Sequence, residues 1–136
     1  MKLYTYHNYG GNCEQAFRFY EQHLGGKIEA MMTRAQQPTP PEVPPEWKDT
    51  ILFARMSLGD TILMASDVPS GFQPMRSAYL YLSFDSTEEA ERTWALLSDG
   101  GQIFMPLAET FFAVRFGMLR DRFGASWMII QERPQP

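Results

Sequence analysis

The chain has few side chains of the kinds that most often do chemistry: two histidines and one cysteine among 136 residues. His7 lies in a β-prone run, residues 3–9, and His23 lies near the end of a helical pattern. His7 either contacts a ligand or is a structural strand residue, because a register slip of one residue moves a side chain to the opposite face of a sheet. We expect His23 at the surface near a helix C-terminus, where the dipole favours a cation.

The cysteine and several charged residues leave similar choices open. Cys13 begins a predicted helix, where the dipole can lower the pKa of a thiol, but it also begins an apolar stripe and can be a small packed side chain. Arg55 lies in a predicted strand and either holds an anionic ligand in a cleft or is solvated or ion-paired at an edge. Four residues near the C-terminus either lock the last hairpins through ion pairs or bind a ligand: Glu109, Arg115, Asp121 and Arg122.

The elements of the first half are predicted from caps and periodicity. Asn12 and Gln15 occupy the positions of a capping box before a helix that ends at Gly25-Gly26. Its apolar residues fall on one face: Cys13, Ala16, Phe17, Tyr20 and Leu24. Strands are predicted at about 27–33, 50–58 and 61–66. Prolines exclude a regular helix or central strand from 38–45, so 34–49 is predicted to be a surface excursion, either a functional flap or a tolerated insertion.

The second half repeats this order. A β-prone run at 78–84 precedes Ser86 and Glu89, which have the spacing of a capping box. Ala90, Thr93, Trp94 and Leu97 supply the apolar stripe of the following helix, which Asp99-Gly100-Gly101 closes. Strands are predicted at about 102–106, 114–120 and 126–131.

A long internal repeat indicates two copies of one supersecondary unit. Ala16 and Tyr20 match Ala90 and Trp94 at the same offset, and the turn at Gly59 matches Gly124 at a shorter offset. Each half then reads β-α-β-β-β, and the excursion at 34–49 accounts for the difference in offset. The predicted fold is α+β: two βαβββ modules that form a curved mixed sheet of about eight strands with the helices on the outer face. We expect one domain over 1–136, with module one at about 1–67, module two at about 78–131 and a link at 68–77.

The chain resembles a known family over nearly its whole length. Paired βαβββ modules are typical of the vicinal oxygen chelate superfamily, which includes glyoxalase I, fosfomycin- and bleomycin-resistance proteins and extradiol dioxygenases. The closer resemblance is to its PhnB-like branch, through stretches in the same order: 11–17 (GNCEQAF), 58–60 (LGD), 63–67 (LMASD), 105–107 (MPL), 109–111 (ETF), 115–118 (RFGM), 121–124 (DRFG) and 127–128 (WM). Some PhnB-like proteins are described as 3-demethylubiquinone methyltransferases. We expect no such activity, because nothing in the chain resembles a glycine-rich nucleotide-binding loop.

The resemblance implies four positions for a divalent metal, and the residues there are poor ligands for one. They fall near Tyr4 or Thr5 and near Tyr79 on the first strands, and at Leu63 or Met64 and at Met128 on the last strands. Hard divalent ions prefer oxygen or imidazole donors, whereas a thioether suits Cu(I). We therefore expect no metal and no cofactor.

Three functions remain open. The first is metal-free binding of a small, partly apolar or aromatic molecule in a sheet cleft. The candidate cleft residues are Tyr4, Tyr6, His7, Phe53, Arg55, Tyr79, Tyr81 and Met128. The second is a metal-dependent lyase or dioxygenase, and the third is a structural or regulatory dimer without a ligand. No catalytic residue can be assigned, and whether the protein is an enzyme stays open.

Composition limits the partners. The net charge of −4 disfavours nucleic acid and anionic membrane surfaces, which select clustered Lys and Arg. No run approaches the roughly 20 apolar residues of a membrane span, and the N-terminus shows no apolar signal segment. A lone cysteine is consistent with a reducing compartment. We expect a cytoplasmic protein, and the family resemblance implies a homodimer.

Overall fold

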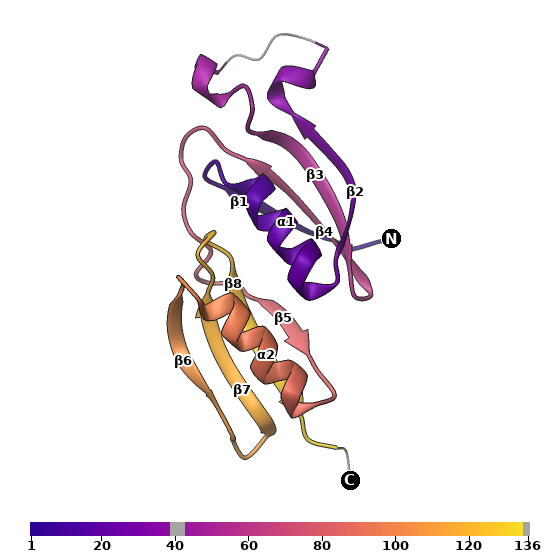
Figure 1. Ribbon diagram of the computed structural model, residues 1–136, viewed down its shortest axis with the longest axis vertical. Helices are drawn as coiled ribbons and strands as arrows, with labels where there is room; N and C mark the ends of the chain where they lie inside the picture. The colour runs from indigo at the N-terminus through magenta and orange to yellow at the C-terminus, as the bar shows by residue number, and fades with distance from the viewer. Residues whose placement is uncertain (39–42, 135–136) are drawn as a thin grey trace. The chain divides into compact units, whose positions relative to one another are not determined.

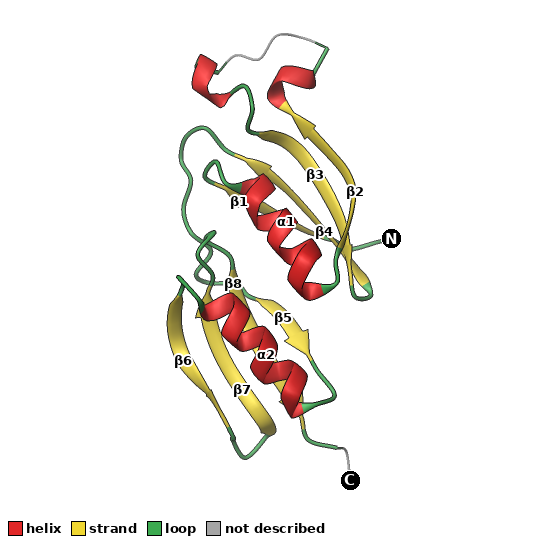
Figure 2. Ribbon diagram, in the orientation of Figure 1, coloured by secondary structure: helices red, strands yellow, loops and turns green. Residues whose placement is uncertain are grey.

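The computed structural model describes residues 1–38 and 43–134, and it divides into two compact units, 1–73 and 74–136. Across the described residues there are eight strands, two α-helices and two short 3₁₀ helices (Figures 1 and 2). Each unit follows the order β-α-β-β-β, so the prediction of two βαβββ modules is confirmed.

The first unit is a four-stranded sheet with one helix. Its strands are β1 (Thr5–Tyr9), β2 (Lys27–Thr33), β3 (Ile51–Leu58) and β4 (Thr61–Asp67). Their spatial order is β1-β4-β3-β2, with β1 parallel to β4 and the other pairs antiparallel. The helix α1 (Cys13–Leu24) connects β1 to β2, and it lies across one face of the sheet in Figure 1.

The second unit repeats this topology. Its strands are β5 (Leu80–Ser83), β6 (Gln102–Ala108), β7 (Ala113–Arg120) and β8 (Ser126–Glu132), and its helix is α2 (Thr87–Ser98). Their spatial order is β5-β8-β7-β6, with β5 parallel to β8. The predicted strands therefore form at nearly the predicted bounds, arranged as two sheets of four.

Each core lies between a helix and its sheet. The predicted stripe of α1 is confirmed for Cys13, Ala16, Phe17 and Tyr20, all fully buried, while Leu24 at the helix end is half-buried. In α2, Ala90, Thr93 and Leu97 are buried. Trp94 lies over β7 at Gly117, where an added Cβ would come within 2.7 Å of the indole ring. A glycine at that position lets the helix approach the sheet closely.

The two helices begin differently. The Ser86 hydroxyl accepts a hydrogen bond from the backbone N–H of Glu89 at 3.1 Å, which confirms Ser86 as an N-cap. Asn12 is the N-cap residue of α1, as predicted, but its side chain makes no capping bond, so the predicted capping box with Gln15 does not form. Instead Asp67 Oδ1, from the end of β4, accepts hydrogen bonds from Gly11 N at 2.9 Å and Cys13 N at 3.0 Å. A residue distant in sequence thus satisfies the backbone donors that a local cap would take.

The excursion between β2 and β3 contains the 3₁₀ helices η1 (Arg34–Gln36) and η2 (Pro45–Trp47). The excursion was predicted at 34–49, and residues 39–42 of it lie outside the described residues. Its ends are joined by backbone hydrogen bonds from Arg34 N to Thr50 O at 3.0 Å and from Ala35 N to Lys48 O at 2.9 Å. The Arg34 guanidinium also donates to the backbone carbonyl of Asp67.

Candidate functional site: the open faces of the two sheets

We call the face of each sheet opposite its helix the open face. In β1, Tyr6 points to this face and is 52% exposed, whereas its neighbour His7 is 8% exposed and Tyr9 is buried beneath α1. In β4, Leu63 and Ala65 are buried and Met64 is half-buried between them. Since alternate residues of a strand share a face, Tyr6 and Met64 belong to the open face of the first sheet.

The strand register places these two residues side by side. Tyr6 is the direct partner of Met64 across the β1–β4 pair, and Arg55 of β3 is the partner of Met64 on its other side. Arg55 Nε donates to Glu29 Oε1 at 2.9 Å, and its guanidinium lies 5.2 Å from the centroid of the Tyr4 ring. The hydrogen bond to Glu29, followed by one to Tyr4, raises the pKa of Arg55. Arg55 is thus ion-paired and also stacked on an aromatic ring.

The second sheet repeats the same pair. Tyr81 of β5 is the direct partner of Met128 across the β5–β8 pair, and Met118 of β7 is the partner of Met128 on the other side. The Tyr81 side chain is 51% exposed, and its hydroxyl donates to Glu132 Oε1 at 2.9 Å. Burial, followed by this hydrogen bond, raises the pKa of Tyr81 above 10.0. A tyrosine beside a methionine therefore occupies the matching place in both sheets.

Three candidate cleft residues remain, and they differ in burial: Phe53, Tyr79 and His7. Phe53 and Tyr79 are half-buried, and Tyr79 lies next to the strand that carries Tyr81. His7 lies on the helix side of its sheet, with its ring centroid 4.4 Å from that of Tyr9 in an edge-to-face contact. The structure therefore does not bring His7 together with Tyr6 and Arg55 on the open face.

Cys13 is a buried core residue. It has no exposed surface, and burial raises the pKa of its thiol, as do the nearby carboxylates of Asp67 and Glu14. Of the two alternatives for this residue, the packed apolar side chain matches its surroundings.

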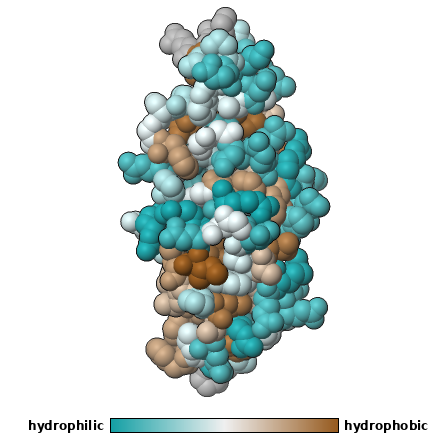
Figure 3. Space-filling model, turned by 60° about the vertical axis from the view of Figure 1, so that its left-hand side comes forward, coloured by the Kyte–Doolittle hydropathy of each residue, from teal (hydrophilic) through white to brown (hydrophobic). Residues whose placement is uncertain are grey.

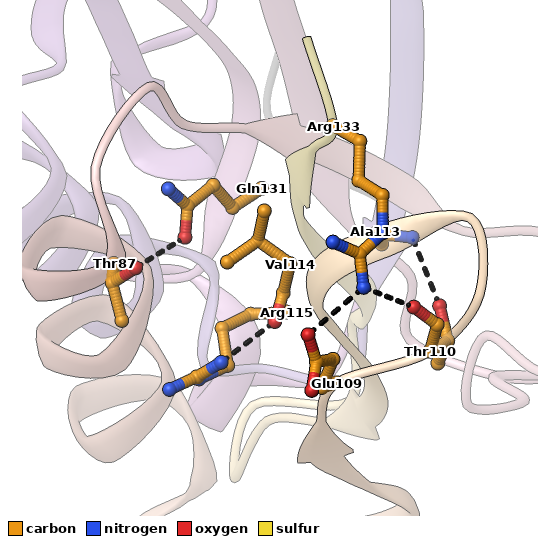
Figure 4. A network of polar contacts seen from close by, with 8 residues as sticks. All are labelled: Thr87, Glu109, Thr110, Ala113, Val114, Arg115, Gln131 and Arg133. Atoms are coloured by element: carbon orange, nitrogen blue, oxygen red, sulfur yellow. Dashed lines mark hydrogen bonds and ion pairs between the residues drawn. The ribbon is translucent and has the colours of Figure 1, made fainter.

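The charged residues near the C-terminus form separate contacts, and Figure 4 shows those of Arg133 with Glu109 and Thr110. Arg133 donates to Glu109 Oε2 at 2.9 Å and to the carbonyl of Thr110 at 2.8 Å, and it joins the C-terminal end of the chain to the β6–β7 turn. Arg115 pairs with Glu91 of α2 at 3.3 Å. Arg122 lies 3.8 Å from Asp99. These are ion pairs between adjacent elements, each with its own partner.

Asp121 has a different role from its charged neighbours. It is 4% exposed, and its Oδ1 accepts hydrogen bonds from the backbone N–H of Phe123 at 2.9 Å and of Ala125 at 3.0 Å. Its Oδ2 accepts from Trp127 Nε1 at 2.8 Å. The carboxylate therefore organises the β7–β8 turn from inside.

The donor set does not fit a divalent metal site of the kind that the superfamily implies. Among residues 1–38 and 43–134, no three His, Cys, Asp or Glu side chains are grouped so that they could hold a metal ion. At the metal positions that the family resemblance implies on the last strands, Leu63 faces the helix side, and Met64 and Met128 offer only thioether sulfur. We therefore derive no metal-dependent step.

Comparisons with known proteins agree with this architecture. A family model described as 3-demethylubiquinone-9 3-methyltransferase matches residues 1–130. Protein YjdN of Escherichia coli strain K12 is 31% identical over 145 residues, which span 100% of this chain and 99% of YjdN. The crystal structure of protein PA1353 from Pseudomonas aeruginosa is 40% identical, with a TM-score of 0.88 over 98% of this chain and 99% of that one.

Two further solved structures extend the comparison. A PhnB protein from Bacillus cereus is 25% identical, with a TM-score of 0.82 over 96% of this chain and 99% of that one. The fosfomycin resistance protein FosX from Mesorhizobium loti is 11% identical, with a TM-score of 0.64 over 98% of this chain and 92% of that one, and it shares the fold.

Together these findings define the class of protein. The fold is that of the glyoxalase/bleomycin resistance/dioxygenase superfamily. The chain belongs to the PhnB-like family whose model is described as 3-demethylubiquinone-9 3-methyltransferase. Among the described residues, no helix is both long and apolar enough to cross a membrane.

Proposed function

We propose that this protein binds a small, partly apolar or aromatic molecule on the open faces of its sheets, without a metal ion. The observation that carries the proposal is the repeated Tyr–Met pair, Tyr6 with Met64 and Tyr81 with Met128. Aromatic and methionine side chains are typical of small-molecule sites, because they offer large, adaptable apolar surfaces with few polar groups. Half-exposed tyrosines on two regular sheets provide such surfaces without further rearrangement of the strands.

Metal independence follows from the donors on these faces. A Lewis-acid site needs several hard donors around one point, and the Tyr–Met pairs supply a thioether and a phenol. Methyl transfer is not part of the proposal, because the paired glycines Gly25-Gly26 and Gly100-Gly101 follow the helices instead of preceding them. A phosphate-binding loop would place its glycines before a helix N-terminus.

Calorimetric titration with 2-naphthalenemethanol, a neutral aromatic probe, tests the proposal. We expect saturable binding that is unchanged after dialysis against EDTA. Tyr6→Ala or Tyr81→Ala should weaken it by about tenfold, the order expected when one aromatic contact is lost. Phe19→Leu on α1 is the matched control and should leave the affinity unchanged. Absence of binding, or loss of binding after EDTA, would refute the proposal.

We also propose that the chain forms a homodimer in the cytoplasm. Hydrophobic side chains reach the surface on the side drawn in Figure 3, and on β6 and the turn after it Ile103, Met105, Phe111 and Phe112 are 49, 41, 92 and 45% exposed. Exposed apolar side chains of this size are typical of interfaces between subunits. Sedimentation equilibrium should give twice the mass of the chain, and Phe111→Ser should shift the equilibrium towards the monomer. A monomeric wild-type protein at micromolar concentration would refute the dimer.

A further inference from the structure

Two arginines, Arg76 and Arg120, form a cationic cluster at one end of the open face of the second sheet. The guanidinium of Arg76 lies 4.1 Å from the centroid of the Phe104 ring, and that of Arg120 lies 5.3 Å from the same centroid. Tyr79 packs edge-on against Phe104, with ring centroids 6.5 Å apart. The Tyr79 hydroxyl accepts a hydrogen bond from Arg76 Nη1 at 2.9 Å. Two positive charges therefore converge on one aromatic ring.

Neither arginine forms an ion pair with a carboxylate in the described part of the chain. The ion pairs found there involve other arginines: Arg18, Arg55, Arg115, Arg122 and Arg133. The acidic residue of β8 on the same face is Glu132, at the opposite end of the strand from Ser126, the partner of Arg120. At 3.3 Å per residue this separation is roughly 20 Å, beyond the Debye length at physiological salt. The cluster therefore offers two guanidinium groups that form no ion pair with a carboxylate of the described residues.

Backbone contacts hold the cluster in place. The carbonyl oxygen of Met75 accepts hydrogen bonds from Arg120 Nε at 3.2 Å and from the Ser126 hydroxyl, and Met75 N donates to the carbonyl of Gly124 at 3.0 Å. The segment that carries Arg76 is thereby fastened to the ends of β7 and β8. Because Arg120 uses Nε in this contact, its two Nη groups remain oriented by the protein and able to donate to a ligand.

An apolar row lies directly beside the cluster. Met118 is the partner of Met128, and Met128 is the partner of Tyr81, so the three side chains form one row across β7, β8 and β5. The row containing Arg120 and Ser126 lies two residues further along the strands, on the same face and about 7 Å away. This arrangement matches a molecule with an anionic end and a flat apolar body.

We propose that the open face of the second sheet binds a small aromatic or apolar carboxylate. Arg76 and Arg120 hold the carboxylate through charge-assisted hydrogen bonds, and the apolar body lies along Met118, Met128 and Tyr81. The inference names the ligand class of the function proposed above and rests on it. It adds the two arginines as the residues that select an anion over a neutral molecule.

A matched pair of probes separates the two proposals. The protein is titrated calorimetrically with 2-naphthoate and with 2-naphthalenemethanol, which share the aromatic body and differ in charge. We expect 2-naphthoate to bind at least about tenfold more tightly, as is typical of hydrogen bonds to a charged group. The double variant Arg76→Gln/Arg120→Gln should remove this difference. Arg92→Gln, on the exposed face of α2, is the control and should leave both affinities unchanged.

Each outcome decides between the proposals. Equal affinities of the wild-type protein for both probes would overturn the carboxylate proposal while leaving the binding function intact, and this comparison requires no variant to fold. A preference for 2-naphthoate that survives in the double variant would overturn the role of the two arginines. If neither probe binds, both proposals fail.

Discussion

The indole Nε1 of Trp127 donates a 2.8 Å hydrogen bond to the buried carboxylate of Asp121, and both side chains are almost completely removed from solvent. The same carboxylate accepts the backbone N–H groups of Phe123 and Ala125. One side chain thus satisfies three donors, two of them buried, at the turn between β7 and β8. In the two strands that this turn joins, Met118 lies beside Met128.

Removing this carboxylate should destabilise the second unit strongly. Asp121→Ala leaves the Trp127 indole and two backbone N–H groups without their acceptor, and unsatisfied buried donors are costly. We expect the free energy of unfolding to fall by about 3 kcal/mol. Urea denaturation followed by circular dichroism measures it, with Asp85→Ala, an exposed position of the same unit, as the control. If Asp121→Ala lowers the free energy of unfolding no more than Asp85→Ala does, the Asp121 carboxylate is not the required acceptor of these donors.

Asp67 should be similarly sensitive in the first unit. Its Oδ1 accepts from Gly11 N and Cys13 N, and its Oδ2 accepts from Ile51 N at 2.8 Å. Asp67→Asn replaces one acceptor oxygen by an amide donor that faces these N–H groups, so we expect a loss of about 2 kcal/mol or more in urea denaturation. Asp49→Asn, at an exposed position of the excursion, serves as the control. Equal stability of the two variants would count against the buried acceptor role.

The two helix starts give opposite expectations for similar substitutions. Ser86→Ala removes the observed capping bond and should lower stability by about 1 kcal/mol. Asn12→Ala removes no capping bond, so stability should stay within about 0.5 kcal/mol of the wild type. The midpoints of urea unfolding of the two variants give the comparison. A loss at Asn12 as large as that at Ser86 would show that the Asn12 side chain caps α1 in solution.

The Cys13 thiol should be unreactive in the folded protein. Its pKa is raised from 9.0 by burial and by neighbouring carboxylates, and a thiol must ionise to act as a nucleophile. With Ellman's reagent at pH 8 we expect slow labelling in buffer and immediate labelling in urea. Asp60→Cys, in the exposed turn between β3 and β4, should react at once. Rapid reaction of one equivalent of the reagent with the native wild-type protein would contradict the burial of Cys13.

The raised pKa of Cys13 also has a consequence at alkaline pH. The unfolded thiol ionises near 9.0 while the folded thiol keeps its proton, so the folded state binds more protons above that pH and loses stability as pH rises. Between pH 8 and pH 10, the urea midpoint of Cys13→Ala should therefore fall less than that of the wild type. Parallel slopes for the two proteins would contradict this assignment.

The helices and strands could be predicted from the sequence because helix caps and apolar periodicity depend on residues that are close together in the chain. Ser86 with Glu89 predicted the start of α2, and the apolar stripe from Cys13 to Tyr20 predicted the buried face of α1. The backbone donors at the start of α1 were predicted to bind the Asn12 side chain, but they bind Asp67, which lies in β4 and comes close to them only on folding. Local sequence patterns do not reveal such long-range hydrogen bonds.

The open faces were harder to predict, since they depend on strand register. Tyr6, Tyr81 and Met128 were proposed as cleft residues, but only the pairing of β1 with β4 and of β5 with β8 shows that each tyrosine has a methionine as its direct neighbour. The face of His7 could not be predicted because one residue of register decides it. Arg76 and Arg120 were not singled out, because their common partner, Phe104, lies on another strand.

The most direct test of metal-free binding on the open faces is a methionine-methyl NMR titration. The protein labelled with ¹³C at the methionine methyl groups is titrated with 2-naphthalenemethanol before and after EDTA, with Met64, Met128 and Met56 assigned by substitution with leucine. We predict saturable shifts of Met64 and Met128 that EDTA does not alter, and no shift of Met56, which is buried on the helix side of β3. Unchanged Met64 and Met128 resonances at saturating probe, or shifts that vanish with EDTA, would contradict it.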